Sequence, residues 1–142
     1  MIVRRLSEIV DGERDVRAPT FASRRFLLAE DGTGFSLHDT VLYAGTTTEI
    51  WYKHHLEAVY CIEGHATVHD LDNDDVHDIR PGTLYTLDGH ERHTLTVHED
   101  VRMICVFTPA LTGNEVHDEE GTYPLLAPNA PEAVPAKEGA NP

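Results

Sequence analysis

The stretch YKHHLEAVYCIEG, residues 52–64, joins a polar lead that contains two histidines to a run typical of a buried β-strand. Strand side chains alternate between two faces, so Glu57, Val59 and Cys61 share one face and Ala58 and Tyr60 lie on the other. Glu57 therefore begins a strand on an otherwise apolar face. A carboxylate in that position needs water or a cation beside it.

Short runs rich in Val, Ile, Leu, Thr and Tyr recur along the chain, separated by turn sequences such as RPG at 80–82 and LDGHE at 87–91. No long segment has a helical period, although VRRLSEIV at 3–10 can form one or two helical turns. Regular short strands with polar turns predict an all-β sandwich or barrel rather than alternating βα units. The expected strands are residues 24–28, 35–43, 48–53, 57–64, 65–70, 76–79, 83–87, 93–98 and 101–108.

The chain of 142 residues fits one domain, which we place at residues 1–126. Residues 127–142 carry four prolines and almost no bulky apolar side chain, so they predict a disordered tail. A formal net charge of -14 repels phosphate backbones and anionic lipid, which argues against nucleic acid and membrane as partners. The first residues, MIVRRLSEIVDGERD, contain no apolar run of signal-peptide length. Two lone cysteines without a C-x-x-C spacing then favour reduced thiols in the cytoplasm.

Alternation also indicates which other side chains can meet inside a barrel. Tyr85 groups with Leu87, His93 with Leu95, Cys105 with Phe107, and His38 with Thr40. If these faces line one interior, it is apolar at one end and holds Glu57, Tyr85 and His93 at the other. A carboxylate, a phenol and an imidazole suit iron or another divalent first-row metal. A solvated Glu at a strand start beside a core Tyr is the alternative, and spacing alone leaves both open.

Two motifs, EAVYCIEG and RPGTLYTLDGHERH, resemble the cupin signature of a double-stranded β-helix or jelly roll. Glu57, Gly64, Gly82 and His93 match the signature. The usual His-x-His before the glutamate is absent, because Trp51, Tyr52 and Lys53 stand there and His54 and His55 fall out of register. Asp88 and His90 replace a Pro and a Gly of the second motif.

Longer segments resemble one cupin family, the ectoine synthases of bacterial osmolyte production and stress response. They are GFSLHDTVLYAGTTTEIWYKHHLEAVYCIEG, PGTLYTLDGHERH and MICVFTPALTGNEVHDEEGTYPLL, and the resemblance covers residues 1 to about 126. It implies that Glu57, Tyr85 and His93 hold iron(II), with other divalent first-row metals as alternatives. A cytoplasmic, head-to-tail homodimer is also implied.

The resemblance further implies a carbon–oxygen hydro-lyase. It would condense N-γ-acetyl-L-2,4-diaminobutyrate within one molecule, losing water to form the cyclic amidine ectoine. Arg25 is expected to bind the substrate carboxylate, with Arg24 on the opposite face, and Glu115 to hold the α-amine, with His117 as a proton carrier near neutral pH. Thr40 and Tyr52 are expected to bond the amide or the developing oxyanion. Phe107 and Cys105 would form a pocket wall, and Phe21 stands where the family commonly has Trp.

Two other functions fit a cupin. An iron-dependent dioxygenase would need two or more histidines in a facial triad, which the missing His-x-His disfavours. A non-catalytic small-ligand-binding cupin would need neither GHERH nor TGNEVHD. We expect His54 and His55 to have structural or electrostatic roles. We expect a surface position for four further histidines, His65, His69, His77 and His98.

Overall fold

The computed structural model of the protein describes residues 1–115, 117–119 and 121–125. The predicted tail at 127–142, and residue 126 of the predicted domain, lie outside these residues. The elements are α1 (Leu6–Ile9), β1 (Asp15–Ala18), β2 (Phe21–Leu27), the 3-10 turn η1 (Ala29–Asp31), β3 (Ser36–Leu42), β4 (Thr47–Ile50), β5 (Leu56–Asp70), β6 (Asp75–Ile79), β7 (Leu84–Thr86) and β8 (His93–Thr108).

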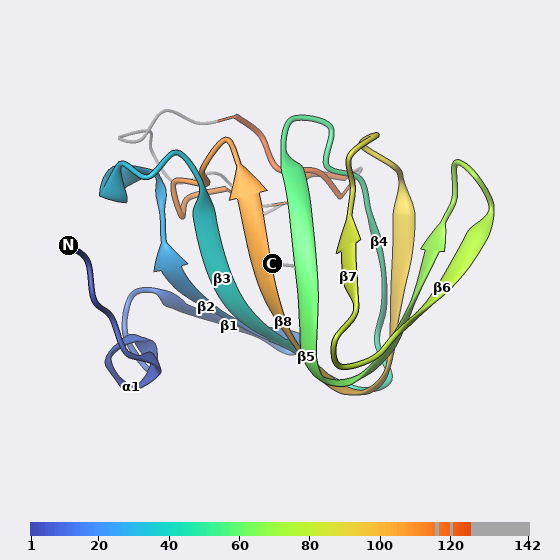
Figure 1. The fold of residues 1–142 in the computed structure, drawn as a ribbon, viewed down its shortest axis with the longest axis horizontal. Coiled ribbons are helices and arrows are strands. Elements are labelled where there is room, and N and C mark those ends of the chain that lie inside the picture. The colour runs from blue at the N-terminus through green and yellow to red at the C-terminus, as the bar shows by residue number, and fades with distance from the viewer. Residues whose placement is uncertain (116, 120, 126–142) are drawn as a thin grey trace.

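All strand pairs of the described chain are antiparallel, and two long strands, β5 and β8, organise them (Figure 1). The second half of β8 pairs with β3 and with the first half of β5, which also pairs with β7. The first half of β8 pairs with β4 and with the second half of β5, which also pairs with β6. Both long strands bend between their halves, so one sheet curls into two facing halves (Figure 1). The predicted all-β barrel with a short N-terminal helix is therefore confirmed.

Several strand boundaries differ from the sequence-based prediction. The runs 57–64 and 65–70 form one strand, β5, and the runs 93–98 and 101–108 form one strand, β8. The predicted breaks are bends rather than turns, because both strands keep pairing through them. Strand β1 was not predicted, since its sequence DVRA is short and half charged. Among the described residues, no helix has the length and apolar character needed to cross a membrane.

Gly64 allows β5 to bend against β8. Its φ is +87°, which favours glycine, and a Cβ there would overlap the backbone oxygen of Asp100. The pairing register shifts around it, between Cys61 and Ala66. Before the bend the odd residues Glu57, Val59 and Cys61 are buried, and after it the even residues Ala66 and Val68 are buried. This bulge keeps the apolar side of β5 turned inward in both halves.

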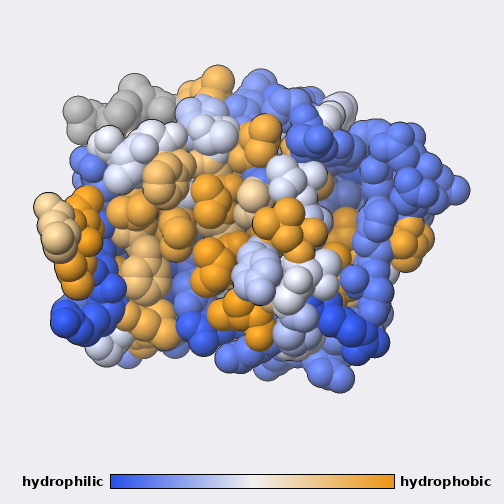
Figure 2. Space-filling view, in the orientation of Figure 1, coloured by the Kyte–Doolittle hydropathy of each residue, from blue (hydrophilic) through white to orange (hydrophobic). Residues whose placement is uncertain are grey.

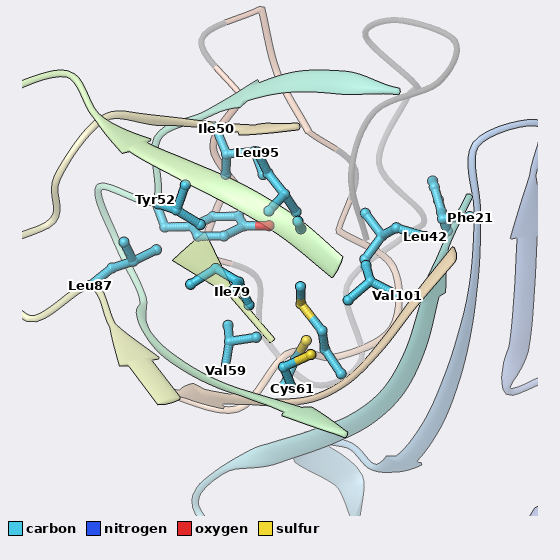
Figure 3. Packing of buried hydrophobic residues seen from close by; sticks show 14 of the residues in the cluster. Phe21, Leu42, Ile50, Tyr52, Val59, Cys61, Ile79, Leu87, Leu95 and Val101 are labelled. Carbon is cyan, nitrogen blue, oxygen red and sulfur yellow. The ribbon is translucent and has the colours of Figure 1, made fainter. Parts of the chain in front are cut away.

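The core fills the space between the two halves of the sheet. Figure 3 shows Val59 and Cys61 from β5, Ile79 from β6 and Val101 from β8 pointing into this space together with Ile50 and Leu95. Each of these side chains is at most 3% exposed. The ring of Tyr52 reaches across the same interior from the segment before β5 (Figure 3). Polar residues that reach this interior near Tyr52 therefore lie beside a dry apolar core.

We predict that Gly64→Ala lowers the free energy of unfolding by about 2–5 kcal/mol, the sum of backbone strain and overlap with the β8 backbone. The matched control is Gly45→Ala. Gly45 has nearly the same φ, +86°, but a Cβ there would have nothing within 4 Å. The control should lose only about 1–2 kcal/mol. Urea unfolding of both variants gives the comparison, and equal losses would show that close packing at Gly64 is not what requires a glycine.

Candidate functional site

Glu57 is a carboxylate on the inner face of the barrel. It lies at the start of β5, opposite Phe107 of β8, and is 5% exposed. Burial alone raises the pKa of Glu57 to about 8. A carboxyl group in this environment is protonated at neutral pH unless a cation replaces the lost water. The predicted solvated alternative for Glu57 is therefore wrong.

His93, the first residue of β8, is 1% exposed and has its two ring nitrogens in different environments. Nδ1 lies 3.1 Å from the backbone oxygen of Glu91, whereas Nε2 is buried without a hydrogen-bond partner among the described residues. Burial lowers the pKa of His93, so the ring is neutral at pH 7. If Nδ1–H donates to Glu91, the lone pair of Nε2 is free to bind a metal, as in many metal-binding histidines.

Tyr85 completes the predicted ligand set. It lies on β7 opposite Val59, and its ring meets that of His93 edge to face, with centroids 6.5 Å apart. Burial raises the pKa of Tyr85 well above its usual range, and the charge of Glu57 raises it further. The structure thus brings Tyr85 close to both Glu57 and His93. No group of three His, Cys, Asp or Glu residues with metal-binding geometry occurs in the described part of the chain, and this candidate set differs because one ligand is a phenol.

Tyr52 and His117 form a buried pair next to these residues. The Tyr52 hydroxyl lies 2.9 Å from Nε2 of His117. The ring of Tyr52 stacks on Tyr123 and meets Phe107 edge to face, with both centroid distances 5.2 Å. Burial lowers the pKa of His117 to about 3, with smaller effects from the charges of Arg25 and His93. His117 is therefore neutral at pH 7, and its role as a proton carrier stays a prediction.

Arg25 and Arg24 lie on opposite faces of β2, as predicted. Arg25 is 6% exposed, and its Nη1 donates to the backbone oxygen of Gly113 at 3.1 Å. Its Nε has no hydrogen-bond partner in the part of the chain that the structure describes. Arg24 instead pairs with Asp39 on the outer face, with Nη2 to Oδ1 at 2.8 Å. Arg25 is thus a buried cation with donor capacity left for an anion.

Thr40 and Cys105 lie on the inner face close to Arg25. Thr40 is 0% exposed, and its hydroxyl lies beside the thiol of Cys105. Burial raises the pKa of Cys105 well above its usual range, and the Glu57 charge adds to the effect. Both cysteines of the chain are buried thiols. At neutral pH Cys105 is therefore a small, uncharged wall residue beside Phe107, which is 0% exposed.

Glu115 lies in the loop that follows β8, and its side chain bonds back to earlier residues of this loop. Its carboxylate accepts hydrogen bonds from the Thr112 amide at 2.8 and 2.9 Å, the Thr112 hydroxyl at 2.7 Å and the Gly113 amide at 3.0 Å. This loop also supplies the Gly113 oxygen to Arg25. Much of the acceptor capacity of Glu115 is thus used inside the protein. Binding of a substrate amine by Glu115 stays a prediction.

Three further residues join this region, and sequence reasoning gave them no catalytic or binding role. His38 and His55 are at most 1% exposed, and Tyr123 stacks against Tyr52. The alternation on residues 35–43 placed His38 on the inner face but gave no reason to single it out. Tyr123 lies in the GTYPL segment, whose position relative to the barrel is a tertiary feature. His54 is exposed, whereas His55 packs edge to face against Phe107 and Tyr123.

Of the four histidines expected at the surface, His77 and His98 are exposed. His65 and His69 are partly covered and lie beside Asp78 and Asp74 respectively. Phe21 is 7% exposed and belongs to the core cluster.

Comparison with known proteins gives a family match over nearly the whole described chain. The family model described as ectoine synthase matches residues 1–127. The chain belongs to the ectoine synthase family. An L-ectoine synthase of Nocardia farcinica is 55% identical over 127 residues, which cover 89% of this chain and 97% of the relative.

Solved structures support both the family and the fold. The crystal structure of an ectoine synthase from P. lautus has a TM-score of 0.81 and 55% identity, and the match covers 94% of this chain and 96% of that chain. A Cupin_2 domain of a transcriptional regulator from Enterobacter cloacae has a TM-score of 0.53 at 14% identity, over 63% of this chain and 96% of that one, and indicates the fold alone. The predicted cupin-type jelly roll is therefore confirmed. As a member of the ectoine synthase family the protein is an enzyme, a hydro-lyase, and the dioxygenase and sensor alternatives are not favoured.

Proposed function

We propose that the enzyme closes the ring of N-γ-acetyl-L-2,4-diaminobutyrate to form ectoine, with a divalent metal ion, iron(II) or another first-row metal, held by Glu57, Tyr85 and His93. Membership of the ectoine synthase family supports the reaction. The observation that carries the metal proposal is the buried carboxylate of Glu57, the pKa of which burial raises to about 8. A bound cation would reverse that penalty.

The side chains fit such an ion in their chemistry. The Glu57 carboxylate and the Tyr85 phenol are oxygen donors, and Nε2 of His93 is a buried nitrogen without a hydrogen-bond partner among the described residues. This oxygen-rich set with one imidazole suits iron(II) and its first-row neighbours. When bound, the ion would act as a Lewis acid that polarises the acetamide carbonyl.

The protein itself supplies orientation and a dry environment. Arg25 would bind the substrate carboxylate through the donor capacity left on its guanidinium. Phe107 and Tyr52, both at most 1% exposed, would hold the carbon chain folded so that the amine approaches the carbonyl. The Thr40 hydroxyl can bond the amide, while the Tyr52 hydroxyl is already paired with His117. Exclusion of water by these rings limits hydrolysis of the acetyl group.

The function is tested by incubating purified, iron(II)-loaded enzyme with N-γ-acetyl-L-2,4-diaminobutyrate under anaerobic conditions and following ectoine by chromatography. We expect ectoine to form without oxygen uptake. Glu57→Ala, Tyr85→Ala and His93→Ala should each lose bound iron and lose at least about 100-fold in activity, because each removes one ligand. His77→Ala, at an exposed position on β6, is the control and should retain both.

Two outcomes would contradict this function. If the iron-loaded wild-type enzyme forms no ectoine, the proposed reaction is excluded. Full iron content in all three ligand variants would remove the ligand assignment, even if ectoine forms.

We also propose that the enzyme is a head-to-tail homodimer. An apolar outer face lies on the outside of the same strands that carry the site on their inner faces, and it is formed by Leu37, Ala58, Tyr60, Ile104 and Val106 on β3, β5 and β8. Figure 2 shows this apolar area across the centre of the view. Exposed Leu84 of β7 lies next to Tyr60, at the end of the sheet.

A cleft lies beside this apolar outer face and shares Leu37 with it. It has a volume of about 610 Å³ and is lined by residues of the N-terminal segment and the outer strands, namely Met1, Ile2, Arg4, Phe26, Leu27, Thr33 and Leu37. In a head-to-tail pair, the N-terminal end of each copy would lie against the Leu84 end of the other. Apolar areas of this extent usually mark protein–protein contacts.

We predict that Leu84→Glu shifts the protein toward the monomer in sedimentation velocity, because the charge would be buried in the contact. The control is Val76→Glu on β6. Val76 is 64% exposed and Leu84 is 61% exposed, so the two changes are alike at the surface of one subunit. A wild-type protein that sediments as a monomer at about 10 µM would contradict the dimer, since stable dimers form well below that concentration.

A cytoplasmic location is the last part of this proposal. Cys61 and Cys105 are both unpaired thiols, which suits a reducing compartment.

A further inference from the structure

His38 is a buried histidine whose ring nitrogens are both unused. It lies on the inner face of β3, is 0% exposed, and neither Nδ1 nor Nε2 has a hydrogen-bond partner among the residues that the structure describes. A buried imidazole that satisfies neither nitrogen loses the hydrogen bonds that water would give it. Such a group is expected where a ligand or an ordered water supplies the missing partner.

The position of His38 relates it to the proposed substrate-carboxylate site. On the inner face, Arg25 of β2 is paired directly with His38 of β3, which is paired directly with Cys105 of β8. Directly paired residues on antiparallel strands have Cβ atoms about 4.5–5.5 Å apart, so their side chains are neighbours. The ring of His38 also packs against Phe107, with centroids 5.4 Å apart. His38 therefore lies between the cation and the apolar wall.

The chemistry of the substrate then decides which of its groups meets His38. Its carboxylate carbon and α-amino nitrogen are bonded to the same carbon atom, so they are about 2.5 Å apart by standard bond lengths and angles. When the carboxylate binds Arg25, the α-amino group must lie within reach of the neighbours of Arg25. We propose that His38 binds the α-amino nitrogen of the substrate, the nucleophile of ring closure. This inference rests on the proposed function and assigns a further binding residue to its site.

The charge state of His38 suits this task. Burial and the charge of Arg25 lower the pKa of His38 well below its usual range, so the imidazole is neutral and one ring nitrogen accepts a hydrogen bond. An amine held between a cation and a neutral imidazole is favoured in its uncharged form, which has the lone pair needed for attack. A carboxylate at this place would favour the unreactive ammonium. The carboxylate of Glu115, in contrast, is engaged by the amides and hydroxyl of its own loop.

The test compares two compounds that differ only in the α-amino group. The substrate is used for kcat and KM, and 4-acetamidobutanoate, which lacks the amine, is used as a competitive inhibitor, both with iron-loaded enzyme. We expect His38→Leu to lower kcat/KM at least about tenfold, the value of one hydrogen bond, while the inhibition constant of 4-acetamidobutanoate changes less than about threefold. Arg25→Met should weaken the binding of both compounds, because both carry the carboxylate.

Two conservative variants keep the test informative if His38→Leu folds poorly. In His38→Asn the new side-chain amide lies near the place of Nδ1, and in His38→Gln it lies near the place of Nε2. We expect at least one of these variants to recover most of kcat/KM, and that variant identifies the ring nitrogen that binds the amine. His98→Leu, at an exposed position on β8, is the control. It should change neither kcat/KM for the substrate nor the inhibition constant of 4-acetamidobutanoate.

The inference is overturned if His38→Leu lowers kcat/KM for the substrate and weakens binding of 4-acetamidobutanoate by the same factor, since that indicates a purely structural role. It is also overturned if neither His38→Asn nor His38→Gln recovers activity. Failure of the proposed function is a different result, because the wild-type enzyme itself would then form no ectoine.

Discussion

The carboxylate of Glu57 is held in an apolar interior, and burial alone shifts its pKa to about 8. An ionised carboxylate is costly there, so the protein either keeps Glu57 protonated or provides a cation beside it. The proposed cation would account for the neighbours of Glu57. They are a phenol from β7, and an imidazole on β8 whose Nε2 is buried without a hydrogen-bond partner among the described residues. The apolar core on one side and the rings of Phe107 and Tyr52 on the other maintain the low dielectric on which this balance depends.

The backbone geometry that presents Glu57 depends on the two bent strands. β5 and β8 each contribute to both halves of the sheet, and the close contact of Gly64 with Asp100 and Val101 marks the place where they bend together. The bulge at that point changes which residues face inward, from odd to even numbers along β5. Without it, either Glu57 and Val59 or Ala66 and Val68 would face solvent. The site and the far half of the core are therefore set by one local feature of the chain.

Much of this arrangement could be predicted from strand alternation. Alternation placed Glu57, Tyr85 and His93 on inner faces, and it grouped Cys105 with Phe107 and His38 with Thr40. Sequence reasoning wrongly ended a strand at Gly64 and at residues 99–100. A glycine and a charged pair inside a strand look like turns when the pairing partner is unknown. The short charged strand β1 was missed because its stability comes from pairing with β2 rather than from its own composition.

The details of the site depended on information that the sequence does not contain. The hydrogen bonds of Glu115 lie within a loop whose shape no periodicity predicts. The neutral state of His117 follows from its burial against Tyr52 and from the charge of Arg25, which are tertiary features. The same is true of His38, which is an ordinary strand residue in the sequence and becomes distinctive only because its nitrogens are left without hydrogen-bond partners among the described residues.

The presence of one cation at Glu57 is tested most directly by diffraction from crystals of the enzyme soaked with iron(II), with data collected on both sides of the iron absorption edge. The account predicts a single anomalous peak per subunit within bonding distance of the Glu57 carboxylate, the Tyr85 oxygen and Nε2 of His93. A peak bound to other residues, or no peak in crystals whose soaked enzyme still forms ectoine, would contradict it.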